Sequence, residues 1–205
     1  MIAILDYGVG NLFSLCSSFR AIGMEAVVTA NSAVIRSAER LILPGVGAFE
    51  DAARKLRESG LDLILKEEVA KGKPLLGICL GMQLLFEKSY EYGEHEGLGL
   101  IKGSVVPMKG SIPIDLKIPH IGWNALHFVG EKDDLFRYVD EGDFVYFVHS
   151  YYGVNDDGAI VATTAYGKEL CAAVRQGNVM GCQFHPEKSG KVGLAILKAF
   201  CEIGE

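Results

Sequence analysis

The chain has 205 residues, of which 49% are hydrophobic, and its formal net charge is −6. This length and apolar content are sufficient for the core of an α/β domain, so we expect one domain over residues 1–205. The acidic balance, without a basic patch, argues against nucleic acid and against an anionic membrane surface as partners.

No run of eighteen apolar residues occurs, and the first apolar run stops at Asp6 with no basic segment before it. This pattern predicts a protein that stays in the cytoplasm. The five cysteines form no C-x-x-C pair, and none has a histidine at zinc-ligand spacing. We therefore expect neither a disulfide framework nor a metal site.

Short apolar runs alternate with segments of helical period through the first half of the chain. Strands are expected at 2–7, 25–30, 40–45 and 74–79, and helices at 11–22, 48–59 and 61–71, each helix closed by a glycine. Strands that alternate with helices predict a parallel sheet.

The second half of the chain is rich in glycine and in strand-like segments. Hairpins or mixed strands are expected at 105–108, 144–152, 159–166, 170–175 and 179–184. The apolar spacing over 188–203 predicts a closing helix.

Cys79 lies between two glycines, in the segment Gly77-Ile78-Cys79-Leu80-Gly81, after a predicted buried strand and before a helix-like segment at 82–87. This is the sulfur counterpart of the G-x-S-x-G nucleophile elbow, which exposes its nucleophile at the end of a sheet. A lone cysteine is more often a small buried hydrophobe. The flanking glycines favour a required backbone geometry instead, and hence a nucleophile.

A histidine and a carboxylate follow the last predicted strand, in Phe184-His185-Pro186-Glu187. A nucleophilic thiol needs a base, and a carboxylate two residues on can hold the second N–H of the imidazole. Taken alone, His185 reads as a turn residue and Glu187 as an acid before a helix. His95, His120 and His127 have no comparable neighbours, and His149 falls within a predicted strand.

The turn Pro44-Gly45-Val46-Gly47 also ends a predicted strand, and its backbone N–H groups could face a developing negative oxygen. With PGVG, GICLGMQ and HPE in this order, the chain resembles the triad (class I) glutamine amidotransferases. The resemblance implies a doubly wound, flavodoxin-like, mostly parallel sheet with helices on both faces and an additional antiparallel section. It also implies a catalytic triad of Cys79, His185 and Glu187, and an oxyanion hole formed by the N–H groups of Val46 and Leu80.

Val46 occupies a position where many members of this family have a second glycine. A β-branched residue stiffens the turn, so we expect a partner to complete the oxyanion hole.

Three further segments resemble one branch of the family, the glutaminase subunits of imidazole glycerol phosphate synthases. They are DYGVGNL at 6–12, PHIGWN at 119–124 and YFVHSY at 146–151. The resemblance implies a heterodimer with a (β/α)₈ cyclase subunit, L-glutamine as substrate, and a role in histidine biosynthesis. The positions that it assigns to glutamine binding are Gly47, Gln83, Glu91, Ser150 and Tyr151. Those that it assigns to the partner interface are Asn11, His120, Trp123, Asn124 and Lys188.

The glycine-rich segment at 6–12 could be mistaken for a dinucleotide-binding loop, but it lacks the third glycine and the later acidic residue. We therefore expect no nicotinamide, and no other cofactor. Two alternatives stay open: a glutaminase of another branch, such as the anthranilate or pyridoxal phosphate branch, and a catalytically silent binding module of the same fold.

Overall fold

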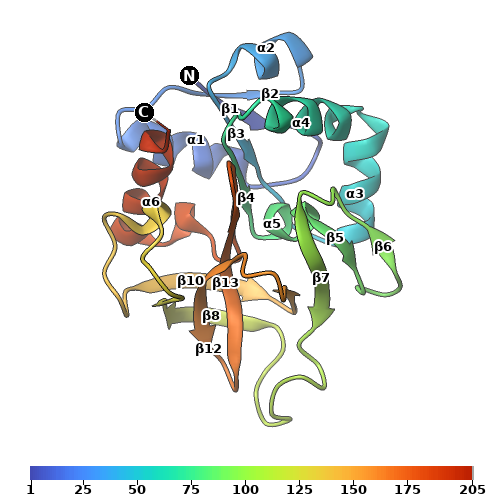
Figure 1. Cartoon of the computed structure of the whole chain (residues 1–205), viewed down its shortest axis with the longest axis vertical. Helices are drawn as coiled ribbons and strands as arrows, with labels where there is room; N and C mark the ends of the chain where they lie inside the picture. Colours follow the sequence, from blue (N-terminus) through green and yellow to red (C-terminus); the bar gives the residue numbers. More distant parts are fainter. Residues whose placement is uncertain (205) are drawn as a thin grey trace.

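The computed structural model describes residues 1–204 and is organised around an eight-stranded sheet (Figure 1). In spatial order its strands are β2 (Ala26–Thr29), β1 (Ile2–Leu5), β3 (Arg40–Leu43), β4 (Leu75–Ile78), β14 (Val179–Cys182), β13 (Glu169–Gln176), β12 (Ile160–Ala165) and β9 (His127–Phe128). The strands from β2 to β14 are parallel, and β13, β12 and β9 continue the sheet antiparallel.

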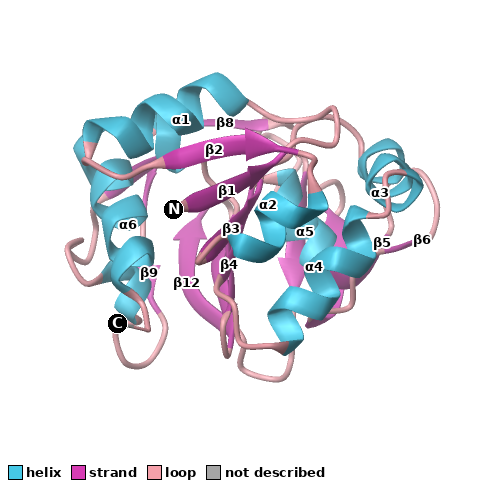
Figure 2. Ribbon diagram, turned by 90° about the horizontal axis from the view of Figure 1, so that it is seen from above, coloured by secondary structure: helices cyan, strands magenta, loops and turns pink. Residues whose placement is uncertain are grey.

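Helices cover both faces of the parallel part (Figure 2). One face packs against α1 (Leu12–Ala21) and α6 (Gly190–Glu202), and the other against α2 (Ser32–Ser37), α3 (Phe49–Glu58), α4 (Leu61–Ala70) and α5 (Leu80–Leu85). Successive residues of a strand point to opposite faces, so Ile2 and Ile4 join the α1 and α6 core while Ala3 and Leu5 join the other. Burial on both faces explains why these strands are continuous apolar runs.

Two smaller sheets lie beyond the central one. The first pairs β8 (His120–Ala125) with β10 (Phe144–His149), and the second has the order β11 (Tyr151–Val154), β7 (Ile101–Pro107), β5 (Phe86–Ser89) and β6 (His95–Glu96). Two 3₁₀ turns, η1 (Asp134–Phe136) and η2 (Pro186–Lys188), complete the elements.

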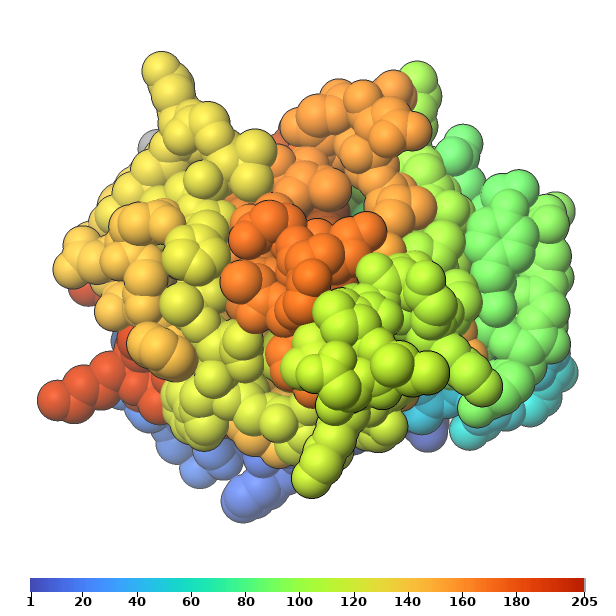
Figure 3. Space-filling model, turned by 90° about the horizontal axis from the view of Figure 1, so that it is seen from below, coloured from blue at the N-terminus to red at the C-terminus, as the bar shows by residue number. Residues whose placement is uncertain are grey.

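Seen from below, the loop 109–118 (yellow-green) lies against the β12–β13 turn (orange), where the Tyr166 hydroxyl donates to the Lys117 carbonyl at 2.8 Å (Figure 3).

The predicted fold class is confirmed: strands and helices alternate from β1 to α5, apart from the consecutive helices α3 and α4, and the mainly antiparallel section follows. Two predicted elements were wrong in their extent. The helix expected at 82–87 begins at Leu80 and ends at Leu85, because Phe86 turns extended and starts β5 beside β7. The strand expected at 144–152 breaks at Ser150, where the chain passes from one small sheet to the other.

Several short elements were not predicted, among them α2 and β8. Helix α2 has six residues, and its signal is Asn31, whose side chain accepts hydrogen bonds from the N–H groups of Ala33 and Val34. Strand β8 contains Gly122 and depends on its pairing with β10. Within residues 1–204, no helix combines the length and apolar content of a membrane span.

Helix α5 lies very close to the end of β3, and Gly81 makes this approach feasible. A Cβ atom placed on Gly81 would lie 1.8 Å from the carbonyl oxygen of Leu43, a backbone atom that cannot move aside independently. We therefore expect Gly81→Ala to lower the free energy of unfolding by about 3 kcal/mol or more. Urea unfolding of the purified chain measures this loss.

The control is Gly72→Ala, because Gly72 has a φ of +91° but open space around it. That variant carries only the left-handed backbone cost, about 1–2 kcal/mol. Equal losses in the two variants would contradict a steric role for Gly81.

Candidate active site

The parallel pairing of β4 with β14 brings together two residues that are far apart in the sequence. Ile78 is in register with Cys182, and the N–H of Cys79 donates to the carbonyl of Cys182 at 2.8 Å. Both strands end at this edge of the sheet, where the chain leads into α5 on one side and toward His185 on the other.

The backbone of Cys79 adopts the strained conformation of a nucleophile elbow. Its φ is 55° and its ψ is −112°, which a non-glycine residue rarely adopts. The sulfur has two polar neighbours, the side-chain amide of Gln183 at 3.8 Å and the carbonyl oxygen of Val148 at 3.9 Å. Such strain at a strand end is typical of a functional residue.

His185 and Glu187 form a buried pair next to this sulfur. Nδ1 of His185 lies 2.8 Å from Oε1 of Glu187, and their side chains are 2% and 1% exposed. Burial by itself lowers the pKa of His185, but its interactions with Cys79 and then with Glu187 outweigh burial and raise this pKa to about 9. His185 is therefore an imidazolium at neutral pH and holds a proton beside the sulfur of Cys79.

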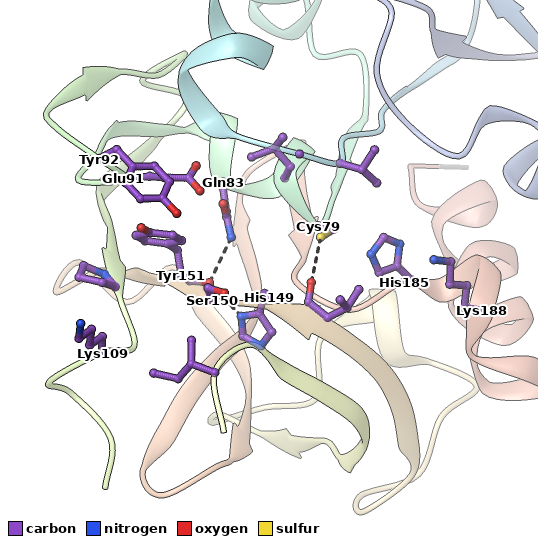
Figure 4. Close-up of a pocket in the computed structure, with 16 residues that line it drawn as sticks. Cys79, Gln83, Glu91, Tyr92, Lys109, His149, Ser150, Tyr151, His185 and Lys188 are labelled. Carbon is purple, nitrogen blue, oxygen red and sulfur yellow. Dashed lines mark hydrogen bonds between the residues drawn. The ribbon is translucent and has the colours of Figure 1, made fainter. Parts of the chain in front are cut away.

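Cys79 and His185 lie at a cavity of about 640 Å³ (Figure 4), and Glu187 is buried behind His185. The cavity wall includes Cys79 and His185 and every residue that the sequence assigned to the oxyanion hole or to glutamine. These are Val46, Leu80, Gly47, Gln83, Glu91, Ser150 and Tyr151. The structure thus brings the positions predicted for the oxyanion hole and for glutamine binding together with Cys79 and His185.

Gln83 is a buried residue of this wall rather than a helix-surface residue. Its side-chain amide donates to the carbonyl of Tyr151 at 3.1 Å and to Oε1 of Gln183 at 2.9 Å. Glu91 is held differently, because its Oε2 accepts from the N–H of Phe49 at the start of α3, at 2.5 Å. Both side chains are therefore fixed in position by hydrogen bonds within the chain.

Sequence reasoning missed several residues of the cavity. His149, Tyr92 and Lys109 line it, as do Pro107, Ile118, Val148 and Lys188, the last of which was assigned only to the interface. Gln183, which was also missed, is buried beneath the cavity. The loops that carry Tyr92 and Lys109 have no motif, whereas His149 and Gln183 could have been found from their closeness to Ser150 and His185 in the sequence.

His149 starts a chain of hydrogen bonds that leads away from the cavity. Its Nδ1 lies 2.9 Å from the carbonyl of Tyr151, its Nε2 lies 3.1 Å from Nδ1 of His120, and Nε2 of His120 lies 2.9 Å from Oδ1 of Asn124. Burial lowers the pKa of His149 to about 3, although the bond to Tyr151 opposes this. His149 is thus a neutral ring, and since a carbonyl only accepts, its proton is assigned to Nδ1.

The residues assigned to the partner interface fall into two groups. Trp123 is 51% exposed and packs edge-to-face on Tyr146 at a centroid distance of 6.0 Å, and Lys188 Nζ lies 6.0 Å from the centroid of the same ring. We call Trp123, Tyr146 and Lys188 the rim cluster, because Lys188 also lines the cavity.

The second group consists of His120, Asn124 and Asn11, and the first two have side chains that are engaged within the chain. His120 is 1% exposed and stacks on Tyr166 and Phe147, so its ring is not available for direct contact and the expected direct contact is not supported. Asn124 is committed to His120 and to the carbonyl of Ala165. Asn11, at the start of α1, makes no side-chain cap.

Val46 and Leu80, whose backbone N–H groups the sequence assigned to the oxyanion hole, both line the cavity with Cys79. Leu80 is the first residue of α5, so no carbonyl of that helix can accept from its N–H. Val46 lines the cavity between Gly45 and Gly47, of which Gly47 has a φ of +96°. The arrangement provides a nucleophile, a proton carrier, its orienting carboxylate and two amides, which together suit attack on a carbonyl or carboxamide carbon.

Comparison with known proteins agrees with this geometry. The family described as glutamine amidotransferase class-I matches residues 3–203. A protein of Aquifex aeolicus called imidazole glycerol phosphate synthase subunit HisH is 50% identical over 96% of this chain and 94% of its own. A protein of the same name from Caldanaerobacter subterraneus is 51% identical, over 99% and 98% of the two chains.

Solved structures agree on the fold. A crystal structure of a glutamine amidotransferase has a TM-score of 0.75 at 20% identity and covers 98% of both chains. The PurLQS structure from Thermotoga maritima has a TM-score of 0.76 at 20% identity, over 98% of this chain and 96% of its own. With its elbow cysteine, its buried histidine and carboxylate, and a family match over nearly its whole length, this chain belongs to the class-I glutamine amidotransferases.

Proposed function

We propose that this chain is the glutaminase subunit of an imidazole glycerol phosphate synthase, which hydrolyses L-glutamine and supplies ammonia to a cyclase subunit in histidine biosynthesis. The observation that carries the proposal is the buried Cys79, His185 and Glu187 constellation at the cavity. Relatives about 50% identical over nearly the full chain bear the name of that subunit. Such coverage favours this branch over other glutaminases of the same fold.

The geometry supports a two-step reaction. The Cys79 thiolate adds to the carboxamide carbon of glutamine, and the N–H groups of Val46 and Leu80 hold the oxygen that becomes negative. The His185 imidazolium gives its proton to the departing nitrogen, so that ammonia leaves and a glutamyl thioester remains on the sulfur.

The second step regenerates the Cys79 thiolate and the His185 imidazolium. Neutral His185 takes a proton from water, which attacks the thioester and releases glutamate, leaving thiolate and imidazolium as before. Glu187 keeps the imidazole ring oriented through both steps, because its Oε1 accepts the Nδ1 hydrogen.

The cyclase partner would consume the released ammonia. Ammonia that reaches bulk water is largely protonated and then has no lone pair for attack, so it needs a sheltered path to the cyclase. The rim cluster fits the middle of that contact, since it joins an exposed tryptophan to the cavity through Tyr146 and Lys188. The relatives' common name designates a subunit, which favours a heterodimer in the cytoplasm.

Cys79→Ala tests the nucleophile. In the complex with the cyclase we expect this variant to lose glutamine-dependent synthesis by at least ~10³-fold and to keep synthesis from ammonium salts, because only the sulfur attacks glutamine. Steady-state rates with the two nitrogen sources measure this. Cys171→Ala is the control, since burial raises the pKa of Cys171 to about 12 and that thiol stays protonated. Loss of both activities in Cys79→Ala would contradict separate sites.

The raised pKa of His185 predicts the alkaline limb of the pH profile. We expect kcat/KM for glutamine to fall as the pH rises through about 9, because neutral imidazole has no proton for the leaving nitrogen. The rate at which iodoacetamide alkylates Cys79 should not fall over the same pH range. In Glu187→Gln the limb should move to lower pH, since one cause of the raised pKa is lost. A limb near pH 6.5 in the unchanged enzyme would refute the imidazolium.

The raised pKa of His185 also makes the free energy of unfolding depend on pH. Because the folded pKa of about 9 exceeds the ordinary value near 6.5, protonation of His185 stabilises the fold fully below pH ~6.5. This contribution is lost as the pH rises through the folded pKa.

Trp123→Ala tests the interface. An exposed tryptophan at the centre of a contact is a frequent hot spot, so we expect affinity for the cyclase to fall about 30-fold, or about 2 kcal/mol. Titration calorimetry measures it, with Leu63→Ala as control. Leu63 is 68% exposed on α4, at the far end of the molecule from β8 (Figure 1). Equal affinity for the two variants would place the contact elsewhere.

A further inference from the structure

Tyr7 follows β1 and reaches the turn that carries Val46. Its ring is buried, with 6% of the residue exposed, and its hydroxyl donates to the carbonyl of Pro44 at 2.5 Å. Strand β1 is the parallel neighbour of β3, so the carboxyl ends of both strands lie side by side and Tyr7 meets the turn that follows β3. A buried tyrosine hydroxyl normally finds some acceptor; here the acceptor is a peptide of the Pro44–Gly47 turn.

Close packing holds the Pro44–Val46 segment on two sides. On one side, a Cβ atom on Gly10 would lie 2.8 Å from Cβ of Pro44. On the other, a Cβ atom on Gly45 would lie 2.6 Å from the N of Gly81, in the first turn after Cys79. The segment therefore lies pressed between the loop after β1 and the nucleophile elbow.

Packing of this kind fixes where the segment lies but not how each peptide plane is turned. Val46 lies between two glycines, and glycine permits rotations that other residues resist. The ring of Pro44 fixes its φ, and the bond from Tyr7 to the Pro44 carbonyl fixes the remaining rotation at that residue. The next peptide along the chain is the one that contains the Val46 N–H.

The hydroxyl of Tyr7 remains a donor throughout the working range of the enzyme. Burial first, and then the nearby Cys79, raise the pKa of the Tyr7 phenol well above its ordinary value.

We propose that Tyr7 is a positioning residue, whose hydroxyl holds the Pro44–Gly45 peptide so that the Val46 N–H faces the oxyanion formed at Cys79. This inference rests on the proposed glutaminase function and on Val46 as an oxyanion donor. Tyr7 does not touch the substrate, because its hydroxyl is committed to Pro44. Its effect passes through the orientation of one backbone amide.

Tyr7→Phe removes only the hydroxyl and keeps the buried ring. In the complex with the cyclase we expect kcat for glutamine hydrolysis to fall about tenfold while KM for glutamine changes less than about twofold, because the oxyanion exists only in the transition state. The fall should be smaller than the 10²- to 10³-fold effect of deleting an oxyanion donor outright. Ammonia-dependent synthesis and iodoacetamide alkylation of Cys79 should both stay unchanged.

The matched control is Tyr166→Phe, which removes another hydroxyl bonded to a backbone carbonyl, that of Lys117. It should leave kcat within about twofold, since that bond lies in a different loop. For Tyr7→Phe, an unchanged kcat would overturn the proposal, and so would a rise in KM alone or a parallel loss of alkylation. An absence of glutaminase activity in the unchanged complex would instead refute the proposed function itself.

If Tyr7→Phe proves unstable, Gly10→Ala provides a second test of the same turn. Its new methyl group would press on the ring of Pro44 from the loop after β1. We expect the same selective fall in kcat, with ammonia-dependent synthesis retained as proof of folding. A folded Gly10→Ala variant with unchanged kcat would show that the position of Pro44 does not govern the oxyanion hole.

Discussion

The hydrogen bonds between β4 and β14 are the constraint on which the site depends. These two strands come from distant parts of the chain, yet their register places Ile78 beside Cys182 and joins the Cys79 N–H to the Cys182 carbonyl. A shift of one residue would turn every side chain of β14 to the opposite face of the sheet. Cores on both faces exclude that shift, because Met180 and Cys182 pack against α6 while Val179 packs on the other side. Burial of ordinary apolar residues thus sets the geometry of the catalytic pair.

Two buried histidines near this edge show how partners decide charge. Burial favours the neutral ring in both. His149 has a carbonyl and another histidine as neighbours, and its pKa falls to about 3. His185 has a thiol and a carboxylate as neighbours, and its pKa rises to about 9. The site therefore holds a charged histidine, His185, beside a neutral one, His149, although both side chains are buried.

The interruption between strands β10 and β11 at Ser150 forms a second wall of the cavity. Strands β10 and β11 belong to different sheets, and the residues at their junction, His149 to Tyr151, line the cavity. The carbonyl of Tyr151 receives hydrogen bonds from Gln83 and from His149, which tie this wall to the elbow helix and to the β8–β10 sheet. On the same sheet, Trp123 pairs with Tyr146 across the strands. The residues predicted to face the partner are thus connected to the cavity wall through strand β10.

Local patterns of residues were enough to predict the alternation of strands and helices, the elbow around Cys79 and the pairing of His185 with Glu187, because each is encoded within a few neighbouring residues. The resemblance carried by PGVG, GICLGMQ and HPE added the family, which the match over residues 3–203 confirms. Other features arise from packing between distant segments of the folded chain. This packing buried His120 between Phe147 and Tyr166, ended α5 at Leu85, and joined Tyr7 to Pro44. These features depend on which strands become neighbours, and contacts between distant segments leave no pattern in the local order of residues.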